Sequence, residues 1–406
     1  MDTDILIVGA GNGGIFAAAY AAANGLNFRV IEQNGNVQDT RHWYGAIDSA
    51  AAKEAGEKPA DRAKLLSEIS RYASGKCDQR VVKTWINESG EMIEFIRSIM
   101  EDKYGVKMVY TYGDEAKWPA ENAEHNTDYM YPEIEYTYDR SSGAARNELL
   151  LDYIHELGYD VDFKTSLAKL EKDATGRITG IIAQSTEDDH FIRYNANKGV
   201  LLACGGFPGS PYNDIVYAAA HQPGRVYAQI CDANVLEDAK RFHTIGCSAQ
   251  TRNGGEKYFQ GKVDEAVAAG TLFVCDTIEE LADKLGFTGE AKDTFLATVE
   301  RYNELYDKQN DEDFGKPAYR LSAIRTAPFY GCWLGASLLT TEQGIAINDK
   351  GQALDNDNKP MPGLYVTGDM SGSFFANNYP CLMAGVAMGR TLTYAIKAIK
   401  QMGGLE

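Results

Sequence analysis

The apolar pattern at the start of the chain predicts a strand, a helix and a second strand in close succession. An apolar run, Ile5–Val8, is followed by the turn Gly9-Ala10-Gly11-Asn12-Gly13-Gly14 and then by the small-residue stretch Ile15–Ala23. A second apolar run, Phe28–Ile31, ends at Glu32. Short apolar runs on either side of a longer alanine-rich segment are typical of a β-α-β unit.

The glycines of this turn have the spacing found where a dinucleotide binds. Gly9 lets the chain turn sharply after the strand, Gly11 leaves room for a pyrophosphate to approach the backbone, and Gly14 lets the helix pack close to the strand. The helix N-terminus offers free N–H groups to an anion, and Glu32 can accept the hydroxyls of an adenosine ribose. The alternative is an ordinary β-α-β unit that uses glycine only for turning.

The remaining pattern predicts an α/β protein in which a second domain interrupts the first. We expect helices at 61–72, 81–85, 91–103 and 147–157, followed by strands at 161–163, 167–172, 177–184, 191–194 and 199–203. Two helices at 278–285 and 291–308, a strand at 363–367 and a closing helix within 380–401 complete the chain. Residues 211–316 differ in character from their flanks. We therefore predict one discontinuous domain, 1–210 and 317–406, and an inserted α+β domain, 211–316.

Charge and cysteine content exclude several classes of function. The formal net charge of -18 opposes binding to nucleic acid or to an anionic membrane surface. No apolar window approaches the length of a membrane span, and the first strand starts too early to leave room for a signal peptide. The seven cysteines form no C-x-x-C pair, so we expect reduced thiols, a cytoplasmic location and no metal site.

Several segments together resemble the flavoprotein superfamily of fumarate reductases, succinate dehydrogenases and ketosteroid dehydrogenases. They are Ile7–Gly14 with Glu32, Ala203-Cys204-Gly205-Gly206-Phe207, Thr277–Gly286, Thr298–Asn303, Asp313-Phe314-Gly315 and Gly363–Asp369. They span nearly the whole chain in the order of that family. The resemblance implies a Rossmann-like FAD-binding domain with an inserted cap domain, and FAD held without a covalent bond.

The resemblance also implies which residues hold the cofactor. The glycine-rich turn and Glu32 would bind the pyrophosphate and the ribose, Leu167 would lie at the adenine, and Asp369, where the family has glutamate, would bind near the ribityl chain. The full set of expected FAD-binding residues is Gly9, Gly11, Asn12, Gly13, Gly14, Glu32, Gln33, Thr40, Arg41, His42, Leu167, Ala203, Gly205, Gly206, Gly368, Asp369, Leu382 and Met383.

The departures from the family concern the substrate. Fumarate-reductase-like members carry a histidine and arginines that clamp a carboxylate, but this chain has no histidine after His243 and no arginine between Arg325 and Arg390. Tyr379 and Tyr212 instead resemble the two tyrosines that ketosteroid dehydrogenases use at their flavin. A phenol can hydrogen-bond a carbonyl and transfer a proton. The alternative is that both are packing residues of a tyrosine-rich chain. Family members have a longer segment between the Gly205-Gly206-Phe207 strand end and Tyr212, so either the chain is shortened here or a flexible segment is missing from the sequence.

These observations predict an FAD-dependent oxidoreductase that moves a hydride between flavin N5 and an activated C=C or CH–CH unit. The expected substrate is flat and mostly apolar, such as a ketosteroid or an isoflavonoid; reductases of the tetrahydrodaidzein reductase type in gut anaerobes belong to this superfamily. Electrons would come from an external donor or from NAD(P)H. The alternatives are a fumarate- or acrylate-type 2-enoate reductase, a flavin-bearing electron-transfer subunit without its own substrate, and a non-catalytic nucleotide sensor.

Overall fold

The predicted β-α-β unit belongs to the largest sheet in a computed structural model of the protein. The structure describes residues 1–38, 43–54, 56, 59–106, 109–110, 133–135, 146–206, 224, 226–238, 255–316, 318, 321–335, 344–375 and 385–405. Contacts divide these residues into two units, one formed by those before 207 and after 343 and the other by those between 224 and 335.

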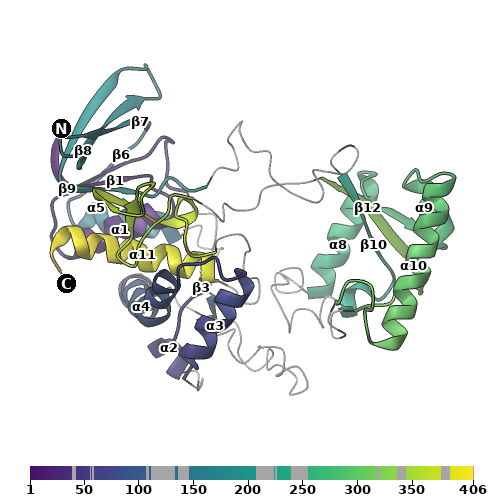
Figure 1. Ribbon diagram of the computed structural model, residues 1–406. Helices are drawn as coiled ribbons and strands as arrows, with labels where there is room; N and C mark the ends of the chain where they lie inside the picture. Colours follow the sequence, from purple (N-terminus) through teal and green to yellow (C-terminus); the bar gives the residue numbers. More distant parts are fainter. Residues whose placement is uncertain are drawn as a thin grey trace. The chain divides into compact units, whose positions relative to one another are not determined.

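An eight-stranded sheet organises the first unit (Figure 1). Its main order is β13-β14-β9-β1-β2-β6. The strands β14, β9, β1, β2 and β6 run parallel to one another, and the edge strand β13 is antiparallel to β14. β7 and β8 extend the sheet from β9 as an antiparallel hairpin. The strands are β1 Asp2–Val8, β2 Phe28–Ile31, β6 Val161–Asp162, β7 Thr165–Lys172, β8 Ile178–Ser185, β9 Phe191–Leu202, β13 Gln352–Leu354 and β14 Pro360–Val366.

Side chains of β1 alternate between two apolar layers, one on each face of the sheet. Ile5 and Ile7 belong to a core shared with the helices α1, α5 and α11, and Leu6 and Val8 belong to a core shared with α3 and α4. The helices of this unit are α1 Asn12–Ala23, α2 Ala50–Glu54, α3 Arg62–Tyr72, α4 Gln79–Arg97, α5 Arg146–Glu156 and α11 Val386–Gly403, with a π-helix η1 Ser98–Lys103 and a 3-10 turn η8 Gly368–Met370. A small sheet joins β3 Trp43–Gly45, β5 Glu133–Glu135 and β4 Val109–Tyr110.

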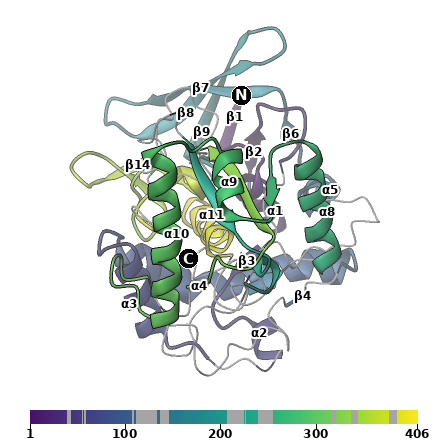
Figure 2. The same cartoon turned by 90° about the vertical axis from the view of Figure 1, so that its right-hand side faces the viewer.

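The second unit is a small sheet with helices packed on it. Its antiparallel order is β10-β12-β11, with bounds Val226–Cys231, Phe329–Gly335 and Phe273–Cys275. The helices are α8 Gly255–Ala268, α9 Ile278–Lys284 and α10 Glu290–Lys308. Figure 2 shows α9 and α10 in front of the strands. The buried apolar core contains Cys275, Leu281, Leu285 and Phe329.

Three sequence-based expectations differ from the structure. The predicted helices 81–85 and 91–103 are one helix, α4, that continues into η1, because Gly90 packs near Ile47 without interrupting the helix. The strands expected at 191–194 and 199–203 are the single strand β9. β12 pairs with β10 and β11, so the second unit reaches beyond the boundary predicted at residue 317.

Within the described residues, none of the helices combines the length and the apolar character needed to cross a membrane.

Candidate functional site

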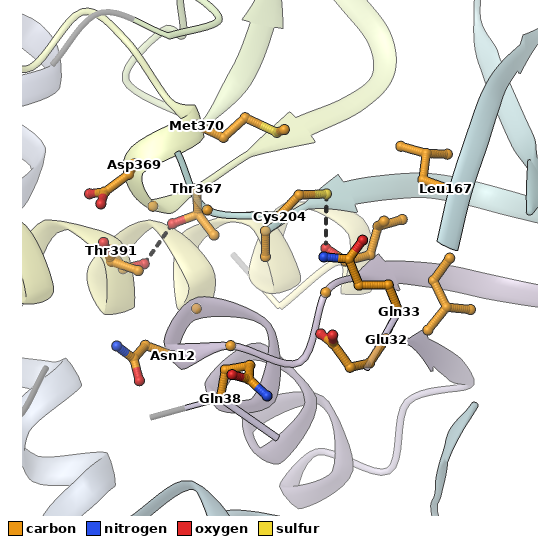
Figure 3. A pocket seen from close by; sticks show the side chains of 18 of the residues that line it. Asn12, Glu32, Gln33, Gln38, Leu167, Cys204, Thr367, Asp369, Met370 and Thr391 are labelled. Carbon is orange, nitrogen blue, oxygen red and sulfur yellow. Dashed lines mark hydrogen bonds between the residues drawn. The ribbon is translucent and has the colours of Figure 1, made fainter. Parts of the chain in front are cut away.

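A cavity of about 450 Å³ opens at the carboxyl ends of four parallel strands of the first unit (Figure 3). The chain leaves β1 at Val8, β2 at Ile31, β9 at Leu202 and β14 at Val366, and the residues that follow each strand line the cavity. The N-terminal part of α1 contributes Asn12 and Gly13 to the wall, that of α11 contributes Ala387, Met388 and Thr391, and β7 contributes Thr165, Ser166 and Leu167. Ligands of open α/β sheets bind at this edge, so the fold itself marks the site.

The glycine-rich turn leaves part of its backbone accessible to an anion. Gly9 has a φ of 101°, and a Cβ there would lie 2.6 Å from the carbonyl oxygen of Ala203. A Cβ on Gly14 would lie 1.7 Å from the carbonyl oxygen of Gly9, so α1 packs against the turn only with glycine there. At Gly11, in contrast, a Cβ would meet nothing within 4 Å. The backbone at Gly11 is therefore open to the cavity.

The N-terminus of α1 is available to a ligand. Gly11 is the N-cap residue, and no side chain caps the first turn of the helix. The amide groups of a first helical turn carry a partial positive charge and have no partner within the helix. A phosphate above Gly11 would find both the open backbone and these donors.

Glu32 is held rigidly at the end of β2. It is 5% exposed. Its Oε2 accepts a hydrogen bond from the N–H of Ala10 at 2.7 Å, and its Oε1 accepts from the N–H and the side-chain amide of Asn34 at 2.9 and 2.8 Å. A carboxylate offers about four acceptor sites, so these bonds fix the orientation of Glu32 and leave acceptor capacity for ribose hydroxyls.

Asp369 lies across the cavity on η8 and is backed by a buried cation. The guanidinium of Arg390, on α11, lies 3.5 Å from Oδ1 of Asp369 and donates to Oγ of Ser371 at 2.8 Å. It also lies over the ring of Phe375 at 4.4 Å. Arg390 is 2% exposed. These contacts hold the Asp369 carboxylate at the cavity wall.

Cys204 follows β9 and contributes a thiol to the cavity wall. Its Sγ donates to the carbonyl oxygen of Val8 at 3.6 Å, as Figure 3 shows. The Cys204 residue is exposed, but desolvation by the protein atoms around its sulfur raises the pKa of the thiol to about 11. The thiol therefore stays protonated near neutral pH and is a poor nucleophile.

Most of the described residues expected to bind the cofactor line this one cavity. They are Gly9, Gly11, Asn12, Gly13, Glu32, Gln33, Leu167, Ala203, Gly205, Gly368 and Asp369. Gly14 and Gly206 do not line it. Thr40, Arg41, His42, Leu382, Met383, Tyr212 and Tyr379 lie outside the described residues. Among the described residues, no group of three or more His, Cys, Asp or Glu side chains is placed to hold a metal ion.

Sequence reasoning missed several residues of the wall. They are Asn34, Gln38, Thr165, Ser166, Thr367, Met370, Ala387, Met388 and Thr391. Thr367 and Met370 flank the expected Gly368-Asp369 pair, so the end of that strand could have indicated them. Thr391 lies inside a helix and accepts at its carbonyl from Oγ1 of Thr367 at 2.6 Å; no sequence pattern distinguishes it.

The residues present fit FAD. The open backbone at Gly11 and the uncapped start of α1 match a pyrophosphate, and the carboxylate at the end of β2 matches an adenosine ribose. Leu167 lies near the β2 end of the cavity (Figure 3), where it can contact an adenine ring.

The chain matches the family described as FAD binding domain over residues 4–231 and 235–381. It is 21% identical to a vinyl phenol reductase from Lactiplantibacillus plantarum, over 95% of this chain and 93% of that protein. It is also 21% identical to a fumarate reductase (cytochrome) from Shewanella frigidimarina, over 96% of this chain and 75% of that protein. The vinyl phenol reductase alignment runs over 483 positions, more than the 406 residues of this chain, so that relative has segments absent here.

A solved structure with the same fold is 3-ketosteroid delta1-dehydrogenase from Sterolibacterium denitrificans in complex with 1,4-androstadiene-3,17-dione. It has a TM-score of 0.66 and 16% identity, with 100% of both chains covered. The predicted fold class, cofactor and enzyme class are thus confirmed: the chain belongs to the FAD binding domain family and is an FAD-dependent oxidoreductase of the group that includes fumarate reductases and ketosteroid dehydrogenases.

Proposed function

We propose that the protein reduces or forms an activated carbon–carbon double bond in a flat, mostly uncharged substrate. Two observations together support this proposal. The chain matches a vinyl phenol reductase over nearly its full length, and its sequence lacks cations where fumarate-type relatives clamp a carboxylate. A small dicarboxylate needs fixed positive charges, whereas an aromatic or steroid ring needs apolar walls and a hydrogen-bonding group.

FAD supplies the hydride chemistry at its N5 atom when it is bound. The residues of the first unit bind and orient it: the α1 N-terminus for the pyrophosphate, Glu32 for the ribose and Asp369 for the ribityl region. We propose that binding is non-covalent. Precipitation with acid checks this, because a non-covalent flavin remains in the supernatant and a covalent one colours the pellet.

We further propose that Tyr379 and Tyr212 handle the proton that accompanies the hydride. The support is their position in the sequence relative to the family's tyrosines. Tyr379→Phe and Tyr212→Phe remove only a hydroxyl, so the expected result is turnover that falls on the order of 10²–10⁴-fold, with the flavin content unchanged. A tyrosine whose Phe variant turns over at the wild-type rate has no part in the proton transfer.

The substrate class is tested on the reduced enzyme. The purified protein is reduced with dithionite without oxygen, and 4-vinylphenol, an enone steroid, an isoflavone, fumarate and acrylate are then added separately. We expect the uncharged conjugated compounds to restore the oxidised flavin spectrum. Restoration by fumarate or acrylate alone would favour the 2-enoate reductase, which the match to a fumarate reductase supports.

If none of these compounds restores the oxidised flavin spectrum, the result would favour an electron-transfer subunit without its own substrate.

The electron donor is tested separately. We propose NADH, NADPH or a separate redox protein, and anaerobic reduction by each nicotinamide in turn distinguishes direct from indirect transfer.

A further inference from the structure

Two buried polar side chains at the start of α5 form hydrogen bonds to separate parts of the cavity wall. Arg146 is 1% exposed and Asn147 is 0% exposed. Neither lines the cavity, but both contact residues that do. Asn12 is the first residue of α1, and Gln38 follows the turn after β2.

The contacts converge on the side-chain oxygen of Asn12. The guanidinium of Arg146 donates to Oδ1 of Asn12, and Nδ2 of Asn147 donates to the same oxygen at 2.9 Å. Nδ2 of Asn147 also donates to the carbonyl oxygen of Gln38 at 2.5 Å. Arg146 is fixed in turn by Oδ1 of Asn147 at 2.8 Å and the hydroxyl of Tyr44 at 2.6 Å.

This arrangement fixes which way the Asn12 amide faces. Because its oxygen accepts from two donors at the start of α5, its NH₂ group points away from those donors. A side-chain amide donor is thereby held beside the first turn of α1, where the backbone is open to the cavity.

The charge of Arg146 also matters at this position. The side chains that line the cavity include the carboxylates of Glu32 and Asp369 but none of lysine, arginine or histidine among the described residues. Among the described residues, a pyrophosphate bound there would therefore meet no cation directly; Arg41 and His42, which the sequence predicts at the cofactor, lie outside them. A guanidinium is always charged in proteins, and in a buried setting its field reaches neighbouring groups with little screening.

We propose that Arg146 is a positioning residue of the pyrophosphate site: it orients the Asn12 amide and supplies a buried positive charge behind the glycine-rich turn. This rests on the proposed placement of the pyrophosphate at that turn. The two are separable, because binding of ADP in competition with FAD by the wild-type protein tests the placement, and the variants below test Arg146.

The experiment compares ADP with adenosine on the full-length protein after removal of its flavin, by calorimetric titration. Arg146→Gln should weaken ADP on the order of 10- to 100-fold, as expected for loss of hydrogen bonding to and from a charged group, and adenosine by less than about 3-fold. Arg146→Lys retains the charge and should recover part of the ADP affinity. Arg62→Gln, which removes a surface guanidinium paired with Asp48 in the same unit, should change neither ligand.

A second variant covers the case in which Arg146→Gln does not fold. Asn12→Ala leaves Arg146 with Asn147 and Tyr44 and removes only the oriented amide, so ADP should again weaken more than adenosine. The proposal is overturned if either variant weakens the two ligands by the same factor, or if ADP binds as tightly as to the wild type. Equal weakening would mean that Arg146 only supports the fold.

Discussion

The two units of the protein differ in how tightly their sequences constrain their structures. In the first unit, two glycines whose added Cβ would lie within 3 Å of a backbone oxygen and a buried carboxylate with three hydrogen-bond donors specify a cavity at the ends of parallel strands. The second unit packs its three-stranded sheet and the helix α9 around a core of four buried apolar residues. The comparison indicates that backbone geometry fixes the cofactor site of the first unit. The second unit depends on a small core of side chains, so its sequence can vary more easily.

Gly14→Ala should have the largest effect of all, and it should fall on the first unit. The new Cβ would lie 1.7 Å from a backbone oxygen that cannot move without displacing the turn. We expect a loss of roughly 3 kcal/mol or more in the free energy of unfolding and purified protein without flavin. Gly261→Ala is the matched control, because a Cβ there, within α8, meets nothing within 4 Å. Normal flavin content in Gly14→Ala would contradict the packing role of this glycine.

Leu281→Ala should have the next largest effect, and it should fall on the second unit. Leu281 is fully buried between α9 and β12, where its side chain covers Gly331. Its truncation should cost about 2–5 kcal/mol and lower the midpoint of a thermal transition. Flavin content should stay at the wild-type level. A parallel loss of flavin would show that the second unit is needed to retain FAD and would break the comparison.

Gly11→Ala should leave the protein stable and weaken only the cofactor. A Cβ at Gly11 meets no protein atom, so the free energy of unfolding of the flavin-free protein should change by less than about 0.5 kcal/mol. The methyl group would occupy the approach of the pyrophosphate, and FAD affinity should fall on the order of 10-fold or more. Titration of the flavin-free protein measures this. Unchanged affinity would place the pyrophosphate elsewhere.

The smallest expected effect is a dependence of stability on pH in the second unit. Backbone N–H groups, first that of Lys316 and then that of Phe314, hold the pKa of Asp311 below its ordinary value. The folded pKa is therefore lower than the unfolded one. The contribution to stability is present above about pH 4 and is lost as pH falls through the folded pKa.

Hydrogen exchange of residues 311–316 measures this effect. Asp311→Asn should open the loop more often than the wild type at pH 7, and the difference should shrink as the pH is lowered below about 4. A difference that does not depend on pH would mean that the carboxylate charge has no part in holding the loop.

The sequence predicted those helices and strands that depend on the local pattern of residues. The runs at Ile5–Val8 and Phe28–Ile31, with the turn and the small-residue stretch between them, predicted β1, α1 and β2 within three residues of each boundary. The cavity residues that could be predicted follow strand ends, where spacing along the chain carries the information. Thr391 and Met388 could not, since helical residues enter the wall only through the packing of α11.

Long-range pairing accounts for the other misses. β12 pairs with strands up to about a hundred residues earlier, and a short apolar segment does not indicate which sheet it joins. Arg146 was missed for a related reason. An arginine at the start of a helix is usually solvated, and its burial follows from Tyr44, Asn12 and Asn147 meeting in the fold.

Reoxidation of the reduced enzyme tests the central claim most directly. Protein reduced with dithionite without oxygen is mixed with 4-vinylphenol or with fumarate, and the return of oxidised flavin absorbance is followed in time. The account predicts a yellow protein whose flavin is reoxidised by the uncharged conjugated alkene at least about tenfold faster than by fumarate. A colourless protein, or one reoxidised by fumarate and not by the uncharged alkene, would contradict it.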